Sequence, residues 1–66
     1  MIKQRFKPGD NAYHKADFFS VALVHAVGVL TDVNGYEEEI LIVSYPKLGS
    51  IMEAASNYNT REEIPQ

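Results

Sequence analysis

The clearest pattern of apolar and polar positions lies at residues 29–43, where two apolar segments flank an acidic one around Asn34-Gly35. Asn-Gly between apolar segments is typical of a two-residue type I′ turn, because both central positions of that turn need a positive φ. The pattern therefore predicts an antiparallel β-hairpin. A two-residue turn also fixes the register of the hairpin, with Asp32 directly opposite Glu37.

The two predicted strands are apolar on both of their faces near the base of the hairpin. In the predicted register, one face carries Val27, Val29, Val33, Tyr36, Ile40 and Ile42. The other face, before it becomes acidic, carries Ala26, Gly28, Leu30, Leu41 and Val43. A strand pair that is apolar on both sides predicts a barrel, a sandwich or a subunit interface. Gly28, inside a predicted strand, indicates a bend or a close backbone approach.

The segments before the hairpin predict two further extended elements. The sequence Pro-Gly-Asp at residues 8–10 is a turn signal, because proline fixes φ, glycine accepts a positive φ and aspartate bonds the backbone beyond it. A short strand is predicted after it, at residues 11–15. Residues 18–24 are rich in β-branched and aromatic side chains, which favours extended structure, although a short helix capped by Asp17 fits the same apolar run.

The segment after the predicted turn at residues 46–49 fits two structures. Ser50 and Glu53 match a capping box, which predicts a short helix. A Pro-x-x-Gly turn after a strand equally predicts a hairpin into another strand. Residues 60–63 match a second capping box and predict a single helical turn, after which Ile64 returns to the core.

The length and composition indicate one small domain. A chain of 66 residues is expected to form a single β domain over residues 1–66, stabilised by roughly 3–5 kcal/mol. The sequence has no cysteine, which fits a reducing compartment. The N-terminal residues lack the apolar region of a signal peptide, and the longest apolar run is too short to span a bilayer. We therefore expect a cytoplasmic protein without a membrane partner.

Four features follow one another in a defined order: a turn at residues 7–10 before a first strand, a hairpin after Gly28-Val29, a turn at Gly49 and a terminal single turn at residues 60–64. This order resembles that of SH3-like small β-barrels of bacteria and phages. The resemblance implies an all-β fold, either an SH3-like small barrel or a strongly curled antiparallel sheet, with a short helix after Gly49 as an open alternative. Such barrels serve as adaptors, nucleic-acid-binding modules, docking subunits and, rarely, enzymes, so the resemblance leaves the function open.

Residues with catalytic or metal-binding chemistry are scarce in the sequence. His14 and His25 are isolated, and without cysteine they cannot complete a zinc site. His25 lies among apolar residues, so we expect a hydrogen-bonded histidine of the core or of an interface rather than a ligand. The sequence predicts no catalytic residue, metal or cofactor, and we expect a non-enzymatic function.

The favoured hypothesis is an interaction module that associates with itself or docks on a protein partner. Phe18 and Phe19 are adjacent and cannot both face one core from a strand, so one of them is expected to emerge as an interface anchor. The carboxylates at the predicted hairpin tip either keep the tip solvated or add selectivity for a basic partner. The candidate interaction residues are Tyr13, Phe18, Phe19, Val21, Asp32, Glu37, Glu38 and Glu39.

Two alternatives come from other functional classes. A nucleic-acid-binding barrel would use Lys3, Arg5, Lys7 and Lys15 together with an exposed aromatic side chain. The net charge of −3 counts against it, because nucleic-acid affinity depends on lysines and arginines that neutralise phosphates. The third hypothesis is an oligomeric enzyme with a site at a symmetry axis, for which the sequence offers no convincing acid, base or nucleophile.

Overall fold

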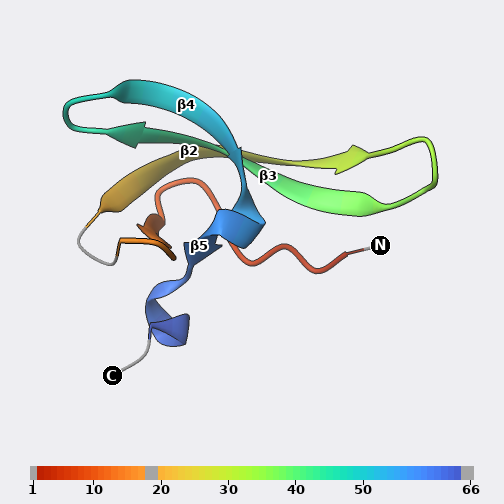
Figure 1. Cartoon of the computed structure of the whole chain (residues 1–66), viewed down its shortest axis with the longest axis horizontal. Coiled ribbons are helices and arrows are strands. Elements are labelled where there is room, and N and C mark those ends of the chain that lie inside the picture. The colour runs from red at the N-terminus through yellow and green to blue at the C-terminus, as the bar shows by residue number, and fades with distance from the viewer. Residues whose placement is uncertain (1, 18–19, 65–66) are drawn as a thin grey trace.

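One antiparallel sheet of five strands organises residues 2–17 and 20–64, which are the residues that the computed structural model describes (Figure 1). The strands lie in the order β4-β3-β2-β1-β5. Their bounds are β1 Asn11–His14, β2 Val21–Thr31, β3 Glu37–Tyr45, β4 Gly49–Ala54 and β5 Tyr58–Asn59. Two 3-10 turns are present, η1 at Ala55–Asn57 and η2 at Arg61–Glu63. The all-β prediction is confirmed, and within the described ranges the sheet is open, with β4 and β5 at its edges.

β2 and β3 form the predicted hairpin, but the predicted turn type and register are wrong. The ladder is shifted by one residue, so Asp32 no longer faces Glu37. Gly35 has a positive φ of 86°, whereas every described non-glycine residue has a negative one, which excludes a type I′ turn. The cause is Asp32, whose Oδ1 accepts the backbone N–H groups of Asn34 (2.8 Å) and Tyr36 (3.0 Å). These bonds stabilise a longer loop in which one residue needs the left-handed conformation.

The corrected register assigns the residues of β3 to two different faces. Glu39, Leu41 and Val43 alternate on the face that packs against the core, and all three are buried. Ile40 and Ile42 lie on the opposite face and are half-buried and exposed, respectively. Successive side chains of a strand point to opposite faces, so a shift of one residue exchanges the two faces of β3 relative to β2. The two sets of residues predicted to share a face are therefore wrong.

A β-bulge interrupts β2 between Val24 and Ala26. The extra residue is His25, whose ring is exposed and places Nε2 2.7 Å from Ser44 Oγ. The predicted hydrogen bond is present, but His25 does not belong to the core, because the bulge removes it from the regular alternation of the strand.

The core lies on one face of the sheet, where the N-terminal segment and the C-terminal turns cover it. Phe6 and Tyr58 come from these two covering segments and pack against the middle of β2 and β3. The buried apolar residues are Phe6, Ala12, Ala22, Val24, Leu41, Val43, Ala55 and Tyr58. The opposite face of β2, β3 and β4 carries apolar side chains that are partly or largely exposed.

The segment after the turn at residues 46–49 is first a strand and then a 3-10 turn. β4 pairs with β3 along its whole length, and η1 begins only at Ala55. The helix predicted from a capping box at Ser50 and Glu53 does not form, because both residues lie in β4. The carboxylate of Glu53 instead accepts a hydrogen bond from the side chain of Asn57 (3.1 Å).

Candidate interaction surfaces

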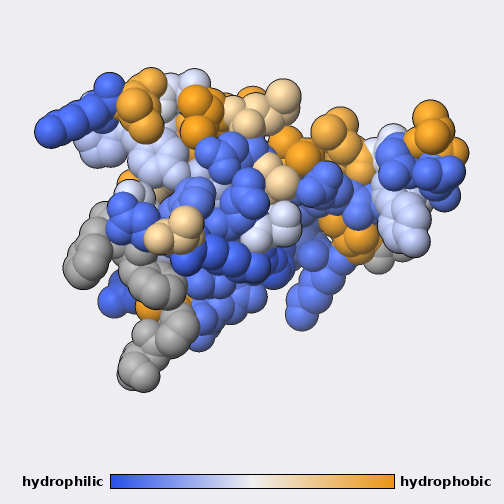
Figure 2. Space-filling model, viewed as in Figure 1, coloured by the Kyte–Doolittle hydropathy of each residue, from blue (hydrophilic) through white to orange (hydrophobic). Residues whose placement is uncertain are grey.

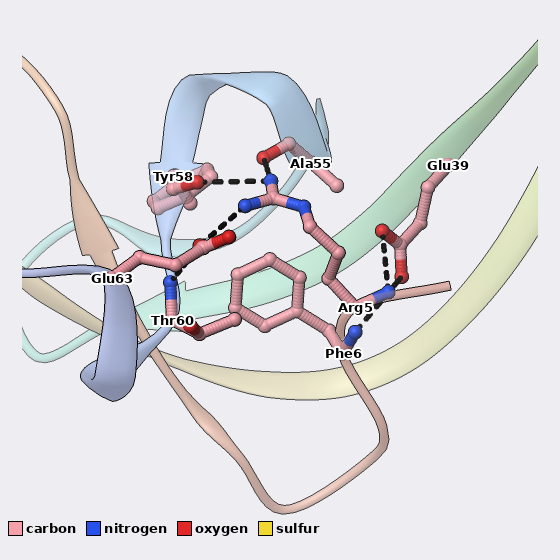
Figure 3. A network of polar contacts seen from close by, with 7 residues as sticks. All are labelled: Arg5, Phe6, Glu39, Ala55, Tyr58, Thr60 and Glu63. Carbon is pink, nitrogen blue, oxygen red and sulfur yellow. Dashed lines mark hydrogen bonds and ion pairs between the residues drawn. The ribbon is translucent and has the colours of Figure 1, made fainter. Parts of the chain in front are cut away.

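Arg5 joins the N-terminal segment to the C-terminal turns (Figure 3). Its Nη1 donates to Glu63 Oε1 (2.5 Å), and its Nη2 donates to the carbonyl oxygens of Ala55 (2.5 Å) and Tyr58 (3.0 Å). The guanidinium carbon lies 5.1 Å from the centre of the Phe6 ring, within range of a cation–π contact. The side chain that the sequence offers as a phosphate ligand therefore binds groups of its own chain and holds the two ends of the domain together.

Glu63 completes the second predicted capping box, which is confirmed at η2. Its Oε1 accepts the backbone N–H of Thr60 (2.7 Å), as the dashed lines in Figure 3 show. This bond, and after it the ion pair with Arg5, lowers the pKa of the Glu63 carboxyl below its usual range. The carboxylate therefore remains ionised in mild acid and keeps η2 attached to the N-terminal segment.

Glu39 is a buried carboxylate and not a member of a solvated cluster. It is 6% exposed, and its two oxygens accept the backbone N–H groups of Arg5 (3.1 and 3.0 Å) and Phe6 (3.0 Å). Glu39 thus attaches the N-terminal segment to β3. The sequence pattern grouped Glu39 with the hairpin tip, although its alternation with Leu41 and Val43, at every second residue, was the signal that it shares their buried face.

The remaining carboxylates of the acidic segment do not converge. Asp32 is bound within the loop, Glu37 is half-buried on the core side, and Glu38 is exposed on the opposite face. Across the described ranges, no group of three histidines, aspartates or glutamates lies close enough together to hold a metal ion. The groove that contains Lys3 and Lys15 is also lined by residues 37–39, so these two candidate phosphate contacts lie beside an acidic segment. The third lysine proposed from sequence, at position 7, is exposed beside the first turn.

The aromatic docking residues predicted from sequence are only partly described by the structure. Phe18 and Phe19 lie outside the described residues. Val21 is exposed at the start of β2 and shares a shallow pocket with Leu48. Tyr13 is half-buried in β1, opposite Val21 on one side and β5 on the other.

A second apolar surface lies on the face of β2, β3 and β4 that is turned away from the core. We call it the outer face and define it by Ala26, Gly28, Leu30, Ile40, Ile42 and Met52. These residues line a shallow groove of about 230 Å³. Leu30 is 58% exposed and Met52 68% exposed. Figure 2 shows apolar atoms along the upper rim of the molecule as far as the hairpin tip, with hydrophilic atoms over most of the lower body.

The sequence did not single out the outer face, because its residues belong to three strands. The wrong register placed Ile40 and Ile42 together with Val27 and Val29, whereas the observed ladder places Ile42 between Ala26 and Met52. The signal available in the sequence was the apolar composition of both faces of the hairpin base.

Tyr58 and Tyr45 form a partly buried polar contact at the core. Their hydroxyl oxygens are 2.5 Å apart, and the ring of His14 packs edge-on against Tyr58 with 5.2 Å between ring centres. Burial, and after it the hydrogen bond with Tyr45, raises the pKa of the Tyr58 hydroxyl far above its usual value. Tyr58 therefore stays neutral, and its hydroxyl stabilises the core.

Comparison of the chain with models of known protein families, with curated proteins and with solved structures finds no match. Within the described ranges there is no helix with the length and apolar character that crossing a bilayer requires.

Proposed function

We propose that this domain is a non-enzymatic interaction module that associates with copies of itself through the outer face. The observation that carries the proposal is the continuous apolar surface over β2, β3 and β4, with Leu30, Ile42 and Met52 exposed on it. Exposed apolar patches of this kind are typical of binding surfaces, because their removal from water provides the free energy of association.

The amount of surface that the domain exposes favours a second copy as the partner. The accessible surface is 4857 Å², whereas a monomeric protein of 7.4 kDa is expected to expose about 4200 Å². The difference of about 650 Å² approaches the roughly 800 Å² that each partner buries in a standard interface. The radius of gyration of 11.9 Å likewise exceeds the value of about 10.8 Å expected for a monomeric domain of this length.

Sedimentation velocity tests the proposal with a matched pair of variants. The wild-type protein is expected to exceed 7.4 kDa over concentrations of about 1 μM to 1 mM. Leu30→Lys places a charge on the part of the outer face that β2 carries and is expected to shift the protein towards monomer. Leu48→Lys is the control, because Leu48 is similarly exposed, at 74%, but lies in the β3–β4 turn away from the outer face.

Two results would contradict the proposal. The first is a wild-type protein that remains monomeric over the whole concentration range. The second is an equal loss of association in both lysine variants, which would mean that added charge, and not the outer face, governs assembly. Nucleic-acid binding is not proposed, because Lys3 and Lys15 lie in a groove that is also lined by the acidic residues 37–39 and because the net charge is −3.

A further inference from the structure

β2 has an open edge over its second half. The strand is eleven residues long, but β1 pairs only with residues 21–23. Along residues 26–31, β2 is paired on one side with β3, and in the described parts of the chain no hydrogen bond reaches its other side. Beyond Ile40, where β4 no longer pairs with β3, the hairpin consists of residues 29–31 and 37–39 alone and projects from the body as a two-stranded arm (Figure 1). Two strands alone are only marginally stable in water.

The alternation of the ladder shows which backbone groups point to the open edge. The N–H of Asp32 donates to the carbonyl oxygen of Tyr36 (2.9 Å), so Asp32 directs its backbone towards β3. In an antiparallel ladder, residues that bond the neighbouring strand alternate with residues that point away from it. The N–H and C=O groups of Val27, Val29 and Thr31 therefore point away from β3.

The side chains along this edge do not protect it from pairing. Open edges in monomeric proteins commonly carry lysine, proline or another charge that prevents strand addition. Residues 21–31 contain neither lysine nor proline, nor any aspartate, glutamate or arginine. The edge is therefore suited to accept another strand. A second copy of β2 is a suitable partner, because it is also uncharged and would bring no unpaired charge to the contact.

The residues whose backbone groups point outward are spaced evenly on both sides of Val29, and this symmetry makes the edge complementary to itself. With a two-fold axis at Val29, Val29 lies opposite the partner's Val29, and Val27 lies opposite the partner's Thr31. Every residue with outward backbone groups then meets another such residue, and the three pairs form about six hydrogen bonds. No shift of the strand by one residue gives this match, because it would set outward groups against inward ones.

Gly28 fits the same arrangement. In this register Gly28 lies opposite the partner's Leu30 on the outer face. A Cβ atom built at Gly28 would have no heavy atom within 4 Å, so there is open space in which that leucine can lie. A glycine inside a strand costs stability in the isolated domain, and close approach of another chain is a common reason for it.

We propose that two copies of this domain join through the open edges of β2, antiparallel about a two-fold axis at Val29, and so form a continuous sheet. This inference rests on the proposed self-association and specifies its geometry. The two outer faces become neighbours across the axis, and the exposed hairpin tip of each copy lies beside the body of the other.

Single-cysteine cross-linking tests this geometry, because the native chain contains no cysteine. Opposed residues of a hydrogen-bonded antiparallel pair have Cα atoms about 5.5 Å apart, within the range of about 4.4–6.8 Å that a disulfide spans. Val29→Cys is expected to form a disulfide dimer under mild oxidation at least about ten times faster than Val33→Cys. Val33 is the matched control, because it is also a valine and is fully exposed at the tip.

A mixture of two variants gives a second measurement that does not depend on Val29. Val27→Cys and Thr31→Cys are expected to form the mixed dimer faster than either variant forms a dimer with itself. If the wild type sediments as a dimer but Val33→Cys reacts as fast as Val29→Cys, or the mixed dimer is not preferred, the β2 edge is not the interface and the proposed self-association still stands. If the wild type is monomeric, both proposals fail.

Discussion

The body of the domain and the hairpin arm belong to the same sheet, but they are stabilised differently. In the body, Leu41 and Val43 are fully buried. Glu39 binds the N-terminal segment to β3, and the side chain of Arg5 binds it to the C-terminal turns. In the arm, residues 29–31 of β2 and 37–39 of β3 pair only with each other, and Leu30 is exposed. The comparison indicates that the body satisfies its own apolar and polar groups, whereas the arm has groups that a second chain can satisfy.

The largest expected difference between the two regions comes from one substitution made in each. Leu41→Ala removes a fully buried side chain and is expected to cost about 2–5 kcal/mol, which is most of the roughly 3–5 kcal/mol that a domain of this size has. Leu30→Ala is expected to change the stability of the monomer by less than about 0.5 kcal/mol. Urea denaturation at low protein concentration measures both. Similar losses would mean that the arm is packed as tightly as the body.

The second comparison concerns two neighbouring carboxylates. Glu39→Gln replaces the acceptor of three bonds from backbone N–H groups and is expected to cost about 1.5–3 kcal/mol, because bonds to a buried charged group are strong and their loss leaves donors unsatisfied. Glu38→Gln, on the exposed face of the arm, is expected to change the stability by less than about 0.5 kcal/mol. Urea denaturation measures the difference, and hydrogen exchange of the Arg5 and Phe6 amides reports whether the N-terminal segment is released.

An equal effect of the two glutamate substitutions would contradict the assignment of Glu39 as the attachment point of the N-terminal segment. So would unchanged exchange of the Arg5 and Phe6 amides in Glu39→Gln. In either case the segment would be held by apolar contacts of Phe6 alone.

The smallest expected effect is a pH dependence at the C-terminal end of the body. The pKa of Glu63 is lowered in the folded state, so its stabilising contribution is complete above the unfolded pKa of about 4.3 and is lost as the pH falls through the lowered value. Because the side chain is 41% exposed, the contribution is expected to be below about 1 kcal/mol. The free energies of unfolding of wild type and Glu63→Gln should therefore differ at neutral pH and converge in acid.

Glu62→Gln is the control for this pH dependence, because Glu62 lies in the same turn and is exposed. Its stability difference from wild type is expected to be small at neutral pH. A Glu63→Gln difference that persists unchanged in acid would show that the carboxylate charge does not hold η2 to Arg5.

Several local features of the fold could be predicted from the sequence. The alternation that ends in Leu41 and Val43 predicts a strand, and the hairpin and the capping box at Thr60 and Glu63 are present as expected. These features depend on residues that are close in sequence. Their hydrogen bonds and side-chain contacts require little ordering of the rest of the chain, so the local pattern specifies them.

The attachment of the N-terminal segment, the pairing of β5 and the candidate surface were decided by tertiary structure. Glu39 bonds the backbone of Arg5, 34 residues earlier, and β5 pairs with β1 although nothing in its two residues indicates that partner. The outer face likewise forms only when three strands bring Leu30, Ile42 and Met52 together. Such contacts join segments whose approach costs conformational entropy, and the gain that offsets this cost depends on the packing of the whole domain. The local sequence therefore determined the strands and turns, and the tertiary packing determined which side chains are buried and which remain exposed.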